Sequence, residues 1–204
     1  MLPKKLGRAA FSLALFGLLL SGCGGQLAGS AAVIGEERIT EKYLVTQLDE
    51  LKVALGLEAS TPLGEQAARA ILARAIVDLV IREAASAEEI SVSESAVAEE
   101  RGVLEETFGG EDSLIEYAAN QGLPPAMIND ALRTNLLLIA LGQKLSPGVE
   151  PALQQEVASS YVAEFANSLG VQVSPRIGVW VPENLSIAPP PDDLSVPASQ
   201  LQTN

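Results

Sequence analysis

The stretch TPLGEQAARAILARAIVDLVIREAA, residues 61–85, decides the fold that this sequence predicts. Apolar residues cover most of the circumference of a helix placed over residues 63–85, and this pattern predicts a helix that is buried on several sides. Thr61 and Pro62 precede it as an expected cap and first helical residue. The rest of the chain is therefore expected to pack around this segment.

Three charged residues interrupt the apolar surface of that helix. Arg74, Asp78 and Arg82 follow one another at i, i+4 spacing, so they share one helical face. We expect them to form a ladder of charges on the solvated side, with a functional site at the three charges as the alternative.

Further helices are predicted on both sides of the central one, because apolar residues recur at spacings of three and four between capping and glycine signals. Thr40 and Ser93 are the expected N-caps of two of them, and Pro124 with Pro125 is expected to start another. The expected apolar faces are Leu44, Leu48, Leu51 and Leu55, ended by Gly56; Val97, Leu104 and Phe108, ended by Gly109 and Gly110; Leu114, Tyr117 and Ala118, ended by Gly122; Ile128, Leu132, Leu136 and Ile139; and Leu153, Val157, Tyr161, Phe165 and Leu169, ended by Gly170.

Extended segments are predicted near the two ends of the helical region. Residues 31–40, AAVIGEERIT, predict two short strands around a turn at Gly35, and residues 171–180, VQVSPRIGVW, alternate as a strand does. From residue 181 to 204 the chain is rich in proline and has no apolar period, which is typical of a disordered tail. A polyproline ligand for a partner domain is the alternative for this tail.

The composition excludes several kinds of chemistry. The 204 residues include no histidine and one cysteine, so the usual catalytic triads, most zinc sites and an internal disulfide are not expected. We therefore predict no catalytic residue, no metal site and no cofactor. The net charge of −13 also argues against a nucleic-acid partner, which requires clustered basic residues.

The N-terminus carries the features of a bacterial lipoprotein signal. Lys4, Lys5 and Arg8 precede an apolar run over residues 9–20, which is shorter than the roughly 20 residues that span a bilayer. The following Leu-Ser-Gly-Cys resembles a lipobox, in which Cys23 would become the lipidated first residue after cleavage. We expect residues 1–22 to be a signal peptide and residues 23–30 a lipidated linker. An ordinary secreted protein with a free cysteine is the alternative.

Cleavage before Cys23 would leave a strongly acidic chain. It would retain 10 basic and 26 acidic residues, a net charge of −16. Two acyl chains hold a protein stably at a membrane where one chain does not. We therefore expect an extracytoplasmic location in the cell envelope, with the membrane contacted through the lipid anchor.

Four stretches together resemble the N-terminal domain of SurA-type periplasmic chaperones and their foldase lipoprotein relatives. They are AAVIGEERITEKYLVTQLDEL (31–51), ISVSESAVAEE (90–100), FGGEDSLIEYAANQGLPPAMINDALRTNLLLIALGQKL (108–145) and VSPRIGVW (173–180). The resemblance covers residues 31–180 and implies a mainly α domain of about six helices. It also implies a small two-stranded sheet that joins the chain ends, by pairing the strand at Ala31 with the one at Val171.

The sequence departs from that family where its prolyl isomerase domain is normally inserted. Only SPGVEP, residues 146–151, stands at this point, and the histidines of a parvulin active site are absent. The resemblance therefore implies chaperone-like binding of unfolded or extended exported polypeptides, without isomerase activity. It fixes no residue for contact with such clients.

Two other functions remain open. The first is an adaptor lipoprotein that binds one defined envelope protein. The second is an enzyme that uses carboxylates alone, as glycosidases do, with pairs such as Glu99–Glu100, Glu105–Glu106 or Asp192–Asp193. Neighbouring positions on a helix do not face each other, so we interpret these pairs as a solvated acidic surface.

Overall fold

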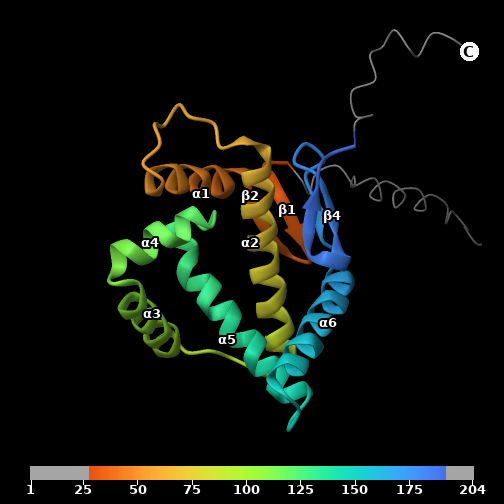
Figure 1. Ribbon diagram of the computed structural model, residues 1–204. Coiled ribbons are helices and arrows are strands. Elements are labelled where there is room, and N and C mark those ends of the chain that lie inside the picture. Colours follow the sequence, from red (N-terminus) through yellow and green to blue (C-terminus); the bar gives the residue numbers. More distant parts are fainter. Residues whose placement is uncertain (1–27, 192–204) are drawn as a thin grey trace, which may run out of the picture.

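The computed structural model describes residues 28–191 as a mainly helical body with two small sheets (Figure 1). The predicted signal peptide, Cys23 and residues 192–204 lie outside the described residues. The elements are β1 (Ser30–Ile34), β2 (Glu37–Thr40), α1 (Glu41–Ala54), α2 (Gly64–Ala87), α3 (Glu94–Phe108), α4 (Glu111–Asn120), α5 (Ile128–Leu145), α6 (Pro151–Leu169), β3 (Gln172–Val173), β4 (Val179–Val181) and β5 (Ser186–Ala188), with 3-10 turns at Pro125–Met127 and Pro182–Asn184. The prediction of a mainly α fold with six helices is confirmed for this part of the chain.

Strand β1 joins the two ends of the described chain. It lies between β2 and β3, antiparallel to both, with Ala32 opposite Val173. All of β1 is buried, including Ser30, so the linker predicted over residues 23–30 ends before this residue. The pairing implied by the family resemblance is present, and β2 makes the sheet three-stranded where two strands were expected.

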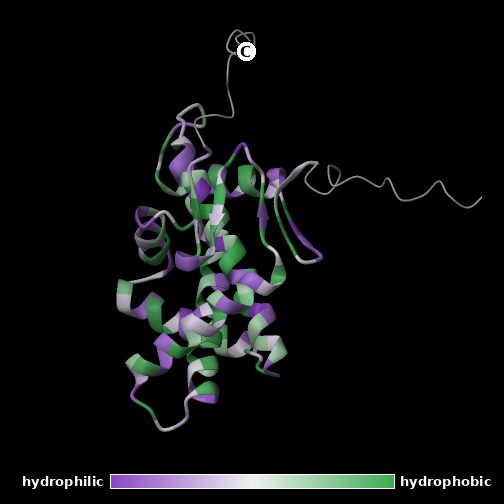
Figure 2. Cartoon of the chain, turned by 90° about the vertical axis from the view of Figure 1, so that its right-hand side faces the viewer, coloured by the Kyte–Doolittle hydropathy of each residue, from purple (hydrophilic) through white to green (hydrophobic). Residues whose placement is uncertain are grey.

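Helix α2 is the centre of the fold. It packs against α1, α5, α6, β1 and β5, and its interior residues include Ile71, Leu72 and Ile76, all nearly inaccessible to solvent. The predicted cap at Thr61 and Pro62 is wrong, because the helix begins at Gly64 and no side chain caps it. Figure 2 shows hydrophobic and hydrophilic residues interleaved along the helices, as packing around a shared interior requires.

Helices α5 and α6 form a hairpin whose close approach depends on small residues. A Cβ atom added to Gly142 would lie 2.7 Å from the carbonyl oxygen of Gln154, so the backbones are in direct contact there. The fully buried residues of α6 are Ala158, Val162 and Ala166. Of the larger residues that were predicted, Tyr161, Phe165 and Leu169 are partly buried and pack against the hydrophobic core, so the prediction is confirmed for these three. Leu153 is 51% exposed, because large side chains cannot fit between helices this close.

Two other predicted apolar positions are also corrected. Val157 on α6 and Ile139 on α5 are exposed, whereas Leu137 and Leu141 supply the buried face of α5. The predicted face of α5 is confirmed at Ile128, Leu132 and Leu136. It fails at Ile139, because the C-terminal half of α5 turns its buried face to both α2 and α6.

The buried apolar residues form two clusters. We call the larger cluster the main core, and we call helices α3 and α4, which the smaller cluster holds against α5, the arm. The main core joins β1, α1, α2, α6, β5 and the C-terminal half of α5, and it includes Ala119 near the end of α4. The arm consists of α3 and α4, whose residues Val97, Leu114 and Ala118 pack on Ile128 and Leu132 at the start of α5. The predicted cap at Ser93 is confirmed by its bond from the Ala96 amide, as is the helix end at Gly109, which has a φ of 89°.

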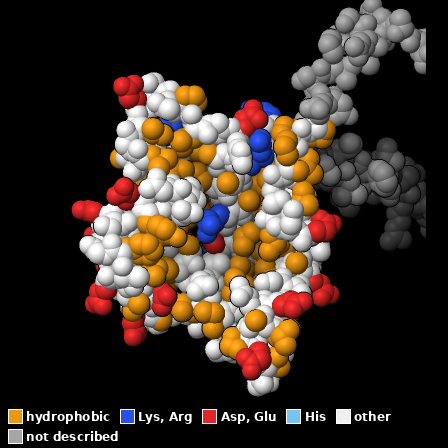
Figure 3. All heavy atoms as spheres, in the orientation of Figure 1, with side chains coloured by type: hydrophobic (Ala, Val, Ile, Leu, Met, Phe, Trp, Pro, Cys, Tyr) orange, Lys and Arg blue, Asp and Glu red, His pale blue; other side chains and the backbone are white. Residues whose placement is uncertain are grey.

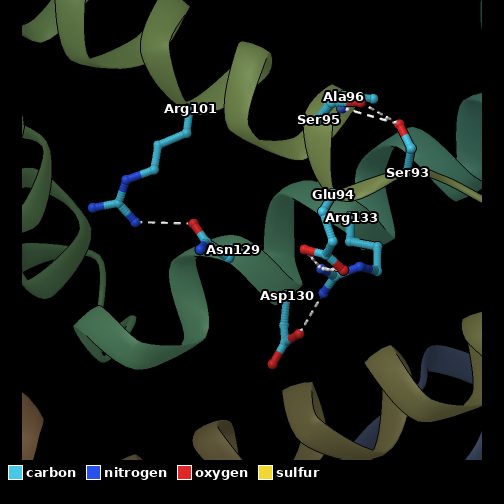
Figure 4. Close-up of polar contacts among 8 residues, drawn as sticks. All are labelled: Ser93, Glu94, Ser95, Ala96, Arg101, Asn129, Asp130 and Arg133. Carbon is cyan, nitrogen blue, oxygen red and sulfur yellow. Dashed lines mark hydrogen bonds and ion pairs between the residues drawn. The ribbon is translucent and has the colours of Figure 1, made fainter.

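Two arginines tie the arm to the start of α5 (Figure 4). The Arg133 guanidinium donates to both carboxylate oxygens of Glu94 on α3 at 2.7 Å, and to Asp130 at 2.8 Å. Arg101 on α3 donates to Asn129 at 2.9 Å. These contacts connect the arm to α5 outside its small apolar interior.

The expected tail begins later than the sequence suggests. Residues 182–188 form a 3-10 turn and β5, which pairs with β4 in a hairpin. Ile187 is buried in the main core, and its contact with α2 orders a segment that proline content alone marks as irregular. The single strand predicted over 171–180 is divided into β3 and β4 by a turn in which Ser174 accepts bonds from the Ile177 and Gly178 amides.

Candidate binding groove

A groove of about 500 Å³ lies between α2 and α5 and faces the viewer in Figure 3. Hydrophobic side chains flank this hollow, and basic and acidic atoms meet at its centre. The residues that line it are Leu51, Ala67, Ala70, Ala73, Arg74, Val77, Asp78, Ile81, Gln121, Gly122, Ala131, Thr134, Asn135, Leu138 and Leu185.

Small residues line much of the α2 side of the groove. On α2 the lining positions Ala70, Ala73, Val77 and Ile81 recur at helical spacing, so they form one continuous strip. Ala131 lines the facing side on α5. Alanine methyl groups leave the space between the two helices open, while the larger side chains form apolar walls. A concave apolar site with a few polar groups is the usual form of a binding pocket.

Asp78 is the most unusual residue of the groove. It is only 5% exposed, and its Oδ1 atom accepts a hydrogen bond from the Thr134 hydroxyl at 2.9 Å. Burial raises the pKa of the Asp78 carboxyl, against the opposing effects of the Thr134 hydrogen bond and the Arg74 charge. Within residues 28–191 this carboxylate has no basic group within ion-pair distance.

The charge ladder predicted on α2 is therefore wrong at its middle position. Arg74 and Arg82 are exposed as expected, but Asp78 points into the protein. One signal was present in the sequence: Asp78 is preceded by Ile76 and Val77 and followed by Leu79 and Val80, which is an unusual setting for a surface carboxylate.

The β4–β5 hairpin contributes one apolar residue to the groove. Leu185 lines it and has a φ of 52°, in the left-handed region that residues other than glycine rarely adopt. Such a conformation costs about 1 to 2 kcal/mol. The contribution of Leu185 was not predicted from the sequence, because the chain from residue 181 onward was expected to be a disordered tail.

A second, smaller pocket of about 370 Å³ lies between the end of α1 and helix α4. Its lining includes Leu55 and Ile115, together with Asp112, Glu116 and Asn120. Glu99–Glu100 and Glu105–Glu106, considered as catalytic candidates, line neither pocket, and Glu105 is bonded to Arg101 on α3. The third pair, Asp192–Asp193, lies outside the described residues.

Neither a metal cluster nor a membrane-spanning helix is found in the part of the chain that the structure describes. Residues 28–191 contain no group of three or more metal-ligating side chains. No helix in that range has both the length and the apolar character needed to cross a bilayer.

Comparisons of this chain with protein-family models, curated proteins and solved structures give no match. The resemblance to SurA-type chaperones therefore stays a prediction from the order of the quoted sequence stretches. No client-contact residue was predicted from that similarity, and the groove residues are identified only by their packing.

Proposed function

We propose that this protein is a lipid-anchored extracytoplasmic lipoprotein that binds extended apolar segments of other exported proteins, with chaperone-like activity and without isomerase activity. The observation that supports this most strongly is the open groove between α2 and α5, with its apolar walls and a few polar groups. An extended segment can lie along such walls while the exposed amide of Asn135 meets its main-chain groups.

The predicted anchor fits this role. Acylation of Cys23 would tether the domain by the few residues that precede β1 at Ser30. A flexible linker of this length has a reach of roughly 15 Å, so the domain would stay near the membrane that exported chains cross. The acidic surface would be repelled by anionic lipids, which would keep the domain from lying flat on them.

The test adds the chain from residue 24 onward to a reduced client protein and measures the aggregation of the client by light scattering. This form keeps every described residue. We expect excess protein to suppress aggregation. Ala70→Trp, which adds bulk at an exposed position in the groove, should reduce suppression at least severalfold. Ala152→Trp is the matched control, because Ala152 is exposed on α6 and does not line the groove.

The adaptor function predicts a different outcome. Aggregation would be unchanged at excess protein, and a pull-down from envelope extract would return one dominant partner. That result would replace the chaperone proposal.

A further inference from the structure

The groove contains a buried carboxylate, Asp78, which forms no ion pair with any basic side chain of residues 28–191. Asp78 Oδ1 is bonded to Thr134, whereas the other carboxylate oxygen has no hydrogen-bond partner among residues 28–191. A carboxylate can accept several hydrogen bonds, and a buried one is strongly stabilised when a cation donates to it. The free oxygen thus offers an acceptor to a ligand in the groove.

The groups around Asp78 leave this position open to a cation. Arg74 and Arg82 lie one turn away on α2, and both are exposed. From α5, the charge of Asp130 also acts on Asp78. Asp130 is ion-paired with Arg133, which also pairs with Glu94 on α3. From α1, Tyr43 is close enough for the Asp78 charge to act on it, and because burial raises its pKa it is neutral at pH 7.

The charge of the whole domain favours basic ligands as well. Residues from Cys23 onward include 26 acidic and 10 basic side chains. Six of those basic side chains are already in ion pairs within the described chain: Lys52, Arg69, Arg101, Arg133, Lys144 and Arg176. A surface of this kind attracts positively charged segments and speeds their association.

We propose that the groove selects extended segments in which a lysine or arginine is flanked by apolar residues, with the cationic group donating to Asp78. This inference rests on the proposed function and specifies its client class. The methylene stem of the basic residue would pack along Val77 and Leu138, and its charged end would reach the carboxylate. The flanking apolar residues would occupy the alanine-lined parts of the groove.

Arg74 leads to the opposite expectation, which is a preference for acidic segments. It also lines the groove, and its charge would favour acidic segments if it were the dominant group. Arg74 is exposed and can turn into solvent, whereas Asp78 is held by Thr134 and cannot leave. For this reason we expect the carboxylate to set the preference.

The experiment uses short fluorescent peptides that are identical except for one central residue, Lys, Gln or Glu, between apolar neighbours. Anisotropy titrations with the chain from residue 24 onward should give tighter binding of the Lys peptide than the Gln peptide by about tenfold, the size expected for a charge-assisted bond. Asp78→Asn should abolish that difference. Asparagine retains an oxygen that can accept from Thr134, and circular dichroism of the variant checks its fold.

Arg74→Gln is the matched variant, because it removes a charge of the opposite sign from the same groove. It should keep or increase the ratio of Lys to Gln affinity. Raising the salt concentration should reduce that ratio in the wild-type protein, which tests the charge without any substitution.

Three results would contradict this inference. Equal binding of the Lys and Gln peptides by the wild-type protein overturns the client class and leaves the proposed function standing. Preference for the Glu peptide that is lost in Arg74→Gln assigns selection to Arg74 instead. Absence of binding by all three peptides overturns the proposed function itself.

Discussion

The main core and the arm are built in different ways. The main core joins 21 buried apolar residues from both ends of the described chain, whereas the cluster between the arm and α5 has five, two of them on α5. The arm is also tied to α5 by Arg101 and Arg133. Local unfolding of a small cluster with exposed polar contacts costs less free energy than unfolding of a large interior. From this comparison we expect the arm to unfold locally while the groove-forming helices α2 and α5 stay packed.

Substitution of a matched pair of leucines should have the largest effect on stability and should distinguish the main core from the arm. Leu72→Ala, at 0% exposure in the main core, should lower the free energy of unfolding by about 3 kcal/mol in urea titrations. Leu114→Ala, at 3% exposure in the arm, removes the same atoms. It should speed amide hydrogen exchange over residues 94–123 with little change in α2. Equal acceleration of exchange in both regions would show that the arm has no independent opening.

A matched pair of glycines gives effects of opposite sign. Gly142→Ala forces a Cβ against the Gln154 backbone and should destabilise the protein by about 2 kcal/mol. Gly102→Ala on α3 meets nothing within 4 Å and should stabilise the arm by about 0.5 to 1 kcal/mol, because alanine favours the helix. Thermal denaturation measures both. A loss of stability in Gly102→Ala would mean that α3 packs differently from this account.

The two confirmed helix caps provide a smaller comparison. Thr40→Ala and Ser93→Ala each remove a side-chain oxygen that accepts an amide bond at a helix start, which costs about 1 kcal/mol. We expect Thr40→Ala to lower the urea midpoint of the whole domain. Ser93→Ala should act mainly on hydrogen exchange in α3, and a global shift of similar size would argue that the arm and the main core unfold together.

The last comparison concerns Asp78, the buried carboxylate found among residues 28–191, whose effect on stability should disappear in acid. Because burial raises the pKa of Asp78 above its usual 3.8, the folded protein binds the proton more tightly than the unfolded chain does. The charged form therefore costs stability as the pH rises through the folded-state pKa. Asp78→Asn should be more stable than wild type at pH 7, with a difference that shrinks toward pH 3. A difference independent of pH would contradict the burial of the charge.

Local signals were sufficient for much of the helical framework. Thr40 and Ser93 were recognised as caps, and Gly109 and Gly170 as helix ends, because each depends on a few neighbouring residues. The backbone conformation at these positions is set locally and does not depend on how the rest of the chain packs. The order of six helices followed from such boundaries and from apolar periodicity.

Features that depend on distant contacts were not predictable in the same way. The buried face of α6 is set by how closely α5 approaches at Gly142, and spacing alone cannot reveal that distance. Asp78 is buried because α5 brings Thr134 to it across 56 positions of sequence. The groove and the contribution of Leu185 likewise arise only when α2, α5 and the C-terminal hairpin come together.

The central claim is that extended apolar segments bind in the groove between α2 and α5. The most direct test places a photo-crosslinking amino acid at Asn135, an exposed residue of the groove, and separately at Glu106, an exposed residue of the arm. With an unfolded client, the account predicts efficient crosslinking from position 135 and little from position 106. Equal crosslinking from the two positions, or crosslinking from 106 alone, would contradict it.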